Sequence, residues 1–163
     1  MKLSDLVPKQ AIVADLQSDD RDGAIDELVD ALKRAERMRE EHREELMLAL
    51  LKREAVASTA LGHGVAIPHA KVKFVEDFCG ALGISRNGID FAAADGQDVH
   101  VIFLFLSPEH AISGHLQLMA HIAGIARNAR FISLLRSART VRELAQLIDD
   151  AEKIIFAPPE ELP

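Results

Sequence analysis

The sequence predicts an α/β fold, a three-layer sandwich in which helices flank a mixed β-sheet. Three observations lead to this prediction: helical and strand periods alternate without a linker, one strand is apolar throughout, and the C-terminal third has a helical pattern. We expect one domain over residues 1–156, because a chain of 163 residues can bury a sizeable core without metal or disulfide. Residues 157–163 are rich in proline and charge, which predicts a disordered tail.

Two amphipathic helices are expected in the N-terminal third. Acidic residues at Asp19 and Asp20 precede the first, as is typical of a helix start. Its apolar residues recur at the spacing i, i+3, i+4, i+7 and are Ile25, Leu28, Val29 and Leu32. The second helix ends near Arg53, and its apolar residues are Leu46, Met47, Leu50 and Leu51.

Short β-forming runs follow these helices. We expect strands at residues 57–60, 65–67, 78–85 and 99–106. The last of them is almost uniformly apolar, as a central strand covered on both faces would be, and Ser107-Pro108 ends it.

The C-terminal third is predicted to be helical. One helix face is expected to consist of Ile112, Leu116, Met119, Ala120 and Ala123. A shorter helix is expected around residues 131–135. A further helix is expected after Thr140–Glu143, which has the pattern of a capping box.

Composition restricts the function. A net charge of −7 disfavours nucleic acid and anionic membranes as partners, because both require a basic surface. The single cysteine, Cys79, excludes a disulfide framework and indicates a reducing compartment. The start of the chain lacks the apolar core of a signal peptide, and no apolar stretch is long enough to cross a bilayer. We therefore expect a cytoplasmic protein.

The segment Thr59–Ala70, which reads TALGHGVAIPHA, carries the strongest functional signal. Gly62 and Gly64 allow the backbone a positive φ or a close approach to a ligand. Val65–Ile67 predicts a short buried strand, and Pro68 restricts the chain immediately before His69. We expect His69 to be held in a defined orientation at the end of this strand.

This segment resembles the active-site segment of the enzyme IIA domains of the fructose–mannitol class of the bacterial phosphotransferase system, whose pattern is roughly T-G-I-G-N-G-[IV]-A-[IV]-P-H-G. Leu51–Glu54 with Ser58-Thr59 is similar to the L-x-R-E…S-T approach of that family. His115–Met119 is similar to its H-L-x-x-L segment. The resemblance covers about residues 45–127, and the combination is more specific than any single motif.

The resemblance implies the same fold and a phosphoryl-transfer component with a covalent phosphohistidine intermediate. His69 would accept the phosphoryl group from an HPr-type phosphocarrier protein in a phosphoenolpyruvate-dependent relay. Neutral imidazole is a competent nucleophile near neutral pH, and its phosphorylated form can pass the group onward. His115 would stabilise the phosphate beside His69, with Arg53 and Thr59 as supporting residues. No cofactor and no metal are expected.

The position of His115 in its helix depends on where that helix begins. If Ser113 is the N-cap, His115 lies in the first turn, where free N–H groups and the helix dipole favour a phosphoryl group. A helix that begins at Ser107-Pro108 would remove this terminus. The sequence does not decide between the two starts.

Two positions depart from the family pattern. His63 stands where the family usually has Asn, and it can strengthen phosphate binding or make it dependent on pH. Ala70 stands where the family usually has Gly, and it would be strained by about 1 kcal/mol if that position has a positive φ.

Two branches of the family remain open. A nitrogen-regulatory IIA would bind target proteins according to its phosphorylation state, whereas a sugar-specific IIA of fructose or mannitol type would pass phosphate to a separate IIB. The regulatory branch is favoured, because the sequence shows neither a membrane span nor a second phosphorylated domain beside the IIA unit.

Two alternatives come from outside phosphoryl transfer. His63, His69 and His115 could hold zinc with an open position, although His-x5-His is not a familiar ligand spacing and the segment contains no acidic residue to act as base. A regulatory binding module that retains the histidines without using them is the other alternative.

Overall fold

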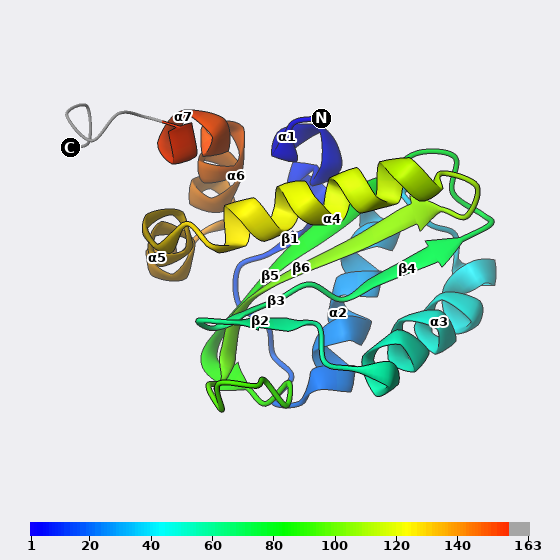
Figure 1. Cartoon of the computed structure of the whole chain (residues 1–163), viewed down its shortest axis with the longest axis horizontal. Coiled ribbons are helices and arrows are strands. Elements are labelled where there is room, and N and C mark those ends of the chain that lie inside the picture. The colour runs from blue at the N-terminus through cyan, green and yellow to red at the C-terminus, as the bar shows by residue number, and fades with distance from the viewer. Residues whose placement is uncertain (157–163) are drawn as a thin grey trace.

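The computed structural model describes residues 1–156, and in this part of the chain a six-stranded mixed sheet lies between two layers of helices (Figure 1). The predicted fold class is therefore confirmed. The predicted tail, residues 157–163, lies outside the described residues.

The α-helices are Leu3–Leu6 (α1), Arg21–Arg34 (α2), Arg43–Val56 (α3), Ile112–Ala126 (α4), Ala129–Ser137 (α5), Val141–Asp149 (α6) and Ala151–Phe156 (α7). The 3-10 helices are Lys9–Ala11 (η1) and Glu40–His42 (η2). The strands are Ile12–Val13 (β1), Ala60–Gly62 (β2), Val65–Ala66 (β3), His69–Val72 (β4), Cys79–Ile89 (β5) and Val99–Pro108 (β6).

Strand β6 is the centre of the sheet. The strand order is β1-β5-β6-β3-β2, and β4 also pairs with β6. β5 is antiparallel to β6, whereas β3 and β4 are both parallel to it. Val65 lies opposite Val101 and His69 lies opposite Phe105, so β3 and β4 follow each other along one edge of β6. The ladder is interrupted at Ile67-Pro68, because proline has no N–H to donate.

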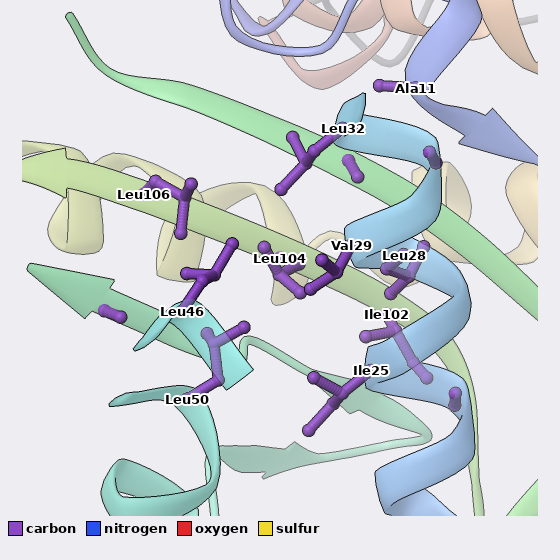
Figure 2. Packing of buried hydrophobic residues seen from close by; sticks show 14 of the residues in the cluster. Ala11, Ile25, Leu28, Val29, Leu32, Leu46, Leu50, Ile102, Leu104 and Leu106 are labelled. Carbon is purple, nitrogen blue, oxygen red and sulfur yellow. The ribbon is translucent and has the colours of Figure 1, made fainter. Parts of the chain in front are cut away.

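Alternate side chains of β6 enter two separate cores. Ile102, Leu104 and Leu106 pack against α2 and α3, as Figure 2 shows. Phe103 and Phe105 point to the opposite face, where α4, α5 and α6 cover them. All five side chains are fully buried, which confirms the prediction of a central strand covered on both faces. Each face of β6 therefore holds one helical layer in place.

Several boundaries differ from the prediction. α3 continues to Val56 rather than ending near Arg53, and β2 begins at Ala60 rather than at residue 57. β4 was not predicted at all. In β4, Ala70 and Val72 are buried and Lys71 is exposed, a period-2 pattern that extends over only four residues. Among the described residues, no helix is both long and apolar enough to cross a membrane.

Helix α4 is rotated relative to the prediction. Ile112 and Leu116, which the sequence predicts on one apolar face of the helix, are 63% and 65% exposed. The buried residues of this helix are His115, Leu118, Ile122, Ile125 and Ala126. The spacing misleads here because α4 has apolar residues on all of its faces, so the pattern does not select the face that is buried. The observed rotation buries His115 and leaves two large apolar side chains exposed beside it.

Candidate phosphoryl-transfer site

His69 is the first residue of β4 and is held there by a backbone contact. Its Nδ1 lies 2.8 Å from the carbonyl oxygen of Ile67, two residues earlier. A carbonyl oxygen only accepts hydrogen bonds, so Nδ1 must carry the proton and donate it. In neutral His69 the lone pair is therefore on Nε2, which is the nitrogen available to attack an electrophile.

His115 lies beside His69 and is almost completely buried, with 6% of its surface exposed. The two rings have their centroids 5.5 Å apart and are tilted by 46°. The Nδ1 of His115 lies 2.7 Å from the hydroxyl oxygen of Ser107, near the end of β6. The central strand and the first turn of α4 thus fix the orientation of this ring together.

Helix α4 begins at Ile112, which is neither of the two starts considered from the sequence. Its N-cap is Ala111, whose side chain forms no capping hydrogen bond, so Ser113 is not the cap. The N–H of His115 donates to the carbonyl of Ala111 over 2.9 Å and is the first intrahelical bond. A Cβ on Gly114 would lie 2.7 Å from the ring of Phe78, so a larger residue at this position would require that ring to move. His115 therefore lies in the first turn, which is one of the two outcomes that the sequence left open, although Ala111 rather than Ser113 is the N-cap.

The surroundings of both histidines favour the neutral form. Burial lowers the pKa of His69 below its ordinary value, and the charges of Arg53 and Lys71 lower it further. The hydrogen bond to Ile67 and the charge of Glu54 oppose this shift without reversing it. The pKa of His115 is lowered by burial first, and then by His69 and Lys71. Neutral imidazole is the form that can act as a nucleophile.

A pocket of about 430 Å³ opens onto both rings. Arg53 lines it from the end of α3, and its Nη1 donates to the carbonyl oxygen of Ala57 over 2.8 Å. Lys52 and Lys71 also line the pocket, and sequence reasoning missed both. Lys71 could have been found, because residues i and i+2 of a strand share a face. These cations suit a site that receives a dianionic group.

Thr59 does not line this pocket. Instead, both its N–H and its hydroxyl donate hydrogen bonds to the buried carboxylate of Glu54. The hydroxyl is thus already engaged in the structure. Since Glu54 follows Arg53 directly, this contact ties the loop before β2 to the helix end that carries the arginine. The role of Glu54 was not predicted from the sequence.

His63 lies away from His69, in the turn between β2 and β3. Its φ is 56°, between Gly62 at 88° and Gly64 at 80°, and its N–H donates to Asp95 over 2.9 Å. Histidine, like asparagine, adopts a left-handed conformation more often than most residues, so the turn accepts His63. Its side chain lines a second pocket at the ends of α4 and α5.

Ala70 is not strained. It lies within β4, is buried, and is not among the described non-glycine residues with positive φ. The cost that would follow from a positive φ at this position therefore does not arise.

The three histidines of the zinc alternative do not converge. His69 and His115 share one pocket, whereas His63 lines the other. Within residues 1–156, no group of three histidine, cysteine, aspartate or glutamate side chains is placed to hold a metal ion.

Comparisons with known proteins agree with this fold. Residues 5–151 match the family described as phosphoenolpyruvate-dependent sugar phosphotransferase system, EIIA 2. A nitrogen regulatory protein of Bradyrhizobium diazoefficiens is 36% identical over 148 residues, which are 91% of this chain and 95% of that protein. The fructose-specific EIIABC component of Bacillus subtilis is 30% identical over 94% of this chain, which spans only 24% of that protein.

Solved structures extend the likeness to the fold. The nitrogen regulatory protein IIA-Ntr of Neisseria meningitidis superposes with a TM-score of 0.80 at 28% identity, covering 90% of this chain and 98% of that one. Enzyme IIAMTL of Escherichia coli, in a complex with phosphorylated enzyme IIBMTL, has the same fold, with a TM-score of 0.69 at 17% identity over 86% of this chain and 94% of that one. The chain therefore belongs to the EIIA 2 family of the phosphotransferase system. The resemblance identified from the sequence is confirmed.

Proposed function

We propose that this chain is a phosphocarrier that accepts a phosphoryl group on Nε2 of His69 from the phosphohistidine of an HPr-type protein. A bond forms between Nε2 and phosphorus, the N–P bond of the donor breaks, and the donor imidazole recovers its lone pair. The observation that carries the proposal is the contact between Nδ1 of His69 and the carbonyl oxygen of Ile67, which leaves Nε2 as the nucleophile.

His115 and Arg53 stabilise the transferred group in this proposal. When Ser107 donates to Nδ1 of His115, the remaining proton of that ring is on Nε2 and can donate to a phosphoryl oxygen. The guanidinium of Arg53 adds a fixed positive charge from the opposite element, α3. Charge that spreads over the equatorial oxygens is thereby met from two sides.

The surface around the pocket suits a protein donor. Ile112 and Leu116 are exposed on α4 to either side of His115, and Val56, which lines the pocket, is 79% exposed. Lys52 and Lys71 add positive charge among these apolar side chains. Such a mixed surface supports brief docking of a partner that presents its own phosphohistidine.

We place the protein in the nitrogen-regulatory branch. The Bradyrhizobium nitrogen regulatory protein is 36% identical to this chain, whereas the fructose-specific relative is 30% identical. A regulator would bind a target protein in one phosphorylation state, because phosphorylation adds about −1.5 to −2 charge to this surface. The second candidate is a sugar-specific IIA that passes phosphate to a IIB, which the EIIABC relative favours. The cytoplasmic location stays a prediction.

Phosphorylation with labelled phosphoenolpyruvate, enzyme I and an HPr-type protein tests the proposal. We expect one acid-labile, base-stable label in the wild type and none in His69→Ala. The control is His110→Ala, because His110 is exposed and does not line the pocket. Label that persists in folded His69→Ala would contradict the assignment.

The branch is tested separately by comparing partners of the wild type, His69→Ala and His69→Asp in pull-downs from lysate. A regulatory protein should recover a partner preferentially in one state, with His69→Asp shifted partway towards phosphorylated behaviour. Identical partners in all three samples, together with rapid transfer to a sugar-specific IIB, would favour the sugar-uptake role.

A further inference from the structure

A second pocket lies at the opposite end of α4 from His115. Its volume is about 610 Å³, and it is lined by the end of α4, one face of α5 and the turn that carries His63. Three arginines contribute to its wall: Arg127, Arg136 and Arg139. Small-molecule sites usually have volumes of roughly 300–1,000 Å³, so this pocket is large enough for a metabolite.

Within residues 1–156, the arginines of this pocket form no ion pair with a carboxylate, although Glu143 accepts a hydrogen bond from the N–H of Arg139 and Asp95 accepts one from that of His63. The lining itself contains no aspartate or glutamate. Like charges that share one pocket repel each other. The arrangement is notable in a chain with 26 acidic and 19 basic residues, in which carboxylates are plentiful.

Helix dipoles explain only part of this arrangement. Arg127 is the C-cap of α4, and Arg136 lies in the last turn of α5, so each offsets the negative end of its helix. The dipoles do not explain why both line a single pocket, or why Arg139 joins them from beyond the end of α5. A bound anion accounts for all three.

The remaining lining indicates what kind of anion fits. Ala126, Ala129 and Ile132 form an apolar part of the wall, and Ser133 and Ser137 add hydroxyl groups along α5. Guanidinium groups bind phosphate through paired N–H donors, and their flat faces stack on planar rings. Phosphate groups at the arginines and an organic part against the apolar wall would use the whole pocket.

We propose that this pocket binds a small organic polyphosphate, with its phosphates on Arg136 and Arg139 and its organic part against Ile132. The site is separate from the phosphoryl-transfer site. His115 and Arg127 are twelve residues apart on α4, which corresponds to about 18 Å along the helix axis. Figure 1 shows α4 crossing the sheet between the β4 end and α5. The proposal goes beyond phosphoryl transfer and does not depend on it.

Isothermal titration calorimetry of the full chain with magnesium-free ATP and with inorganic tripolyphosphate tests the proposal. We expect saturable 1:1 binding of ATP that persists in His69→Ala, because the probe does not bind at the His69 pocket. The double variant Arg136→Gln/Arg139→Gln should weaken binding by at least about tenfold, the scale of losing a charge-assisted hydrogen bond.

The matched control is Arg34→Gln/Arg142→Gln, which removes the same charge from two exposed arginines outside the pocket and should change the affinity less than about twofold. Amide chemical shifts should move at residues 126–129 and 136–139. The proposal is overturned if neither probe binds saturably, if binding disappears in His69→Ala, or if both double variants weaken it equally. Saturable binding of poly-glutamate alone would also overturn it and indicate an acidic protein partner instead.

Discussion

The two pockets at the ends of helix α4 differ in how their polar side chains are held. At the N-terminal end, His69 is partly buried and His115 is buried. The Nδ1 of His69 is hydrogen-bonded to the carbonyl oxygen of Ile67, and the Nδ1 of His115 to the hydroxyl of Ser107. At the C-terminal end, Arg127, Arg136 and Arg139 are exposed. Group transfer requires the first arrangement, because hydrogen-bond donors that already point at the transferred group need no reorganisation during the reaction. Reversible binding of an anion requires only the second.

The largest expected effect in this comparison is that of His115→Ala, which removes a buried donor. Single-turnover phosphoryl transfer to His69 should slow by about 10²-fold, the scale typical of one preorganised donor. Rapid-quench measurement with labelled donor checks this, and thermal unfolding shows whether the variant remains folded. A rate equal to that of the wild type would remove His115 from the site and weaken the distinction between the pockets.

Arg53→Ala should have the next largest effect. We expect transfer to slow by about tenfold, because a charge-assisted hydrogen bond contributes roughly 1.5–3 kcal/mol. The same assay applies, with Arg34→Ala as the matched control, because Arg34 is exposed and does not line this pocket. Equal rates for the two variants would show that the positive charge acts only through the general field of the protein.

Ser107→Ala tests whether the neighbouring hydroxyl positions His115. Losing a neutral hydrogen bond of about 1 kcal/mol should slow transfer about fivefold, less than losing the imidazole itself. The distinguishing measurement is the pair of ¹⁵N ring shifts of His115, which report where the proton resides. The wild type should show the proton on Nε2, and the variant a mixture of both tautomers. Unchanged ring shifts would refute the positioning role.

The smallest expected effect is that of pH between 7 and 6. Because burial lowers the pKa of His69 and of His115, both should keep more of their neutral form in this range than a free histidine, which would lose about two thirds of it. NMR titration of the ring protons, with an unstructured histidine peptide as reference, checks this. A midpoint at or above 6.5 for either ring would contradict the assignment.

Stability should respond to the same titration with a definite sign. The unfolded chain takes up protons on these histidines as the pH falls through 6.5, whereas the folded chain does so only at lower pH. The free energy of unfolding should therefore decrease as the pH falls through this window. Denaturant unfolding at several pH values measures the decrease, and His69→Ala should reduce it.

The pairing of His69 with His115 could be predicted because the signals for both residues are local. Gly62, Gly64 and Pro68 restrict the backbone around His69 within a few residues, and the family pattern identifies His115 by its neighbours. Cys79 is buried, and burial raises the pKa of its thiol to about 11.

The features that escaped prediction arise between distant segments. Ser107 meets His115 only because β6 ends beside the first turn of α4, and Glu54 reaches Thr59 across the end of α3. His63 belongs to the same family segment as His69 and was expected to support phosphate binding there, yet the turn directs it to the second pocket, at the ends of α4 and α5. Contacts of this kind depend on how elements pack, which no local pattern specifies.

By itself, the sequence determined the fold class, the two helical layers and the uniformly buried strand β6, because periodicity and hydrophobic burial act on neighbouring residues. The tertiary structure decided which face of α4 is buried. Apolar residues surround that helix, so packing against Phe103 and Phe105 of the sheet, rather than spacing, sets its rotation. That rotation places the buried His115 beside His69 and leaves Ile112 and Leu116 exposed at the rim of the site.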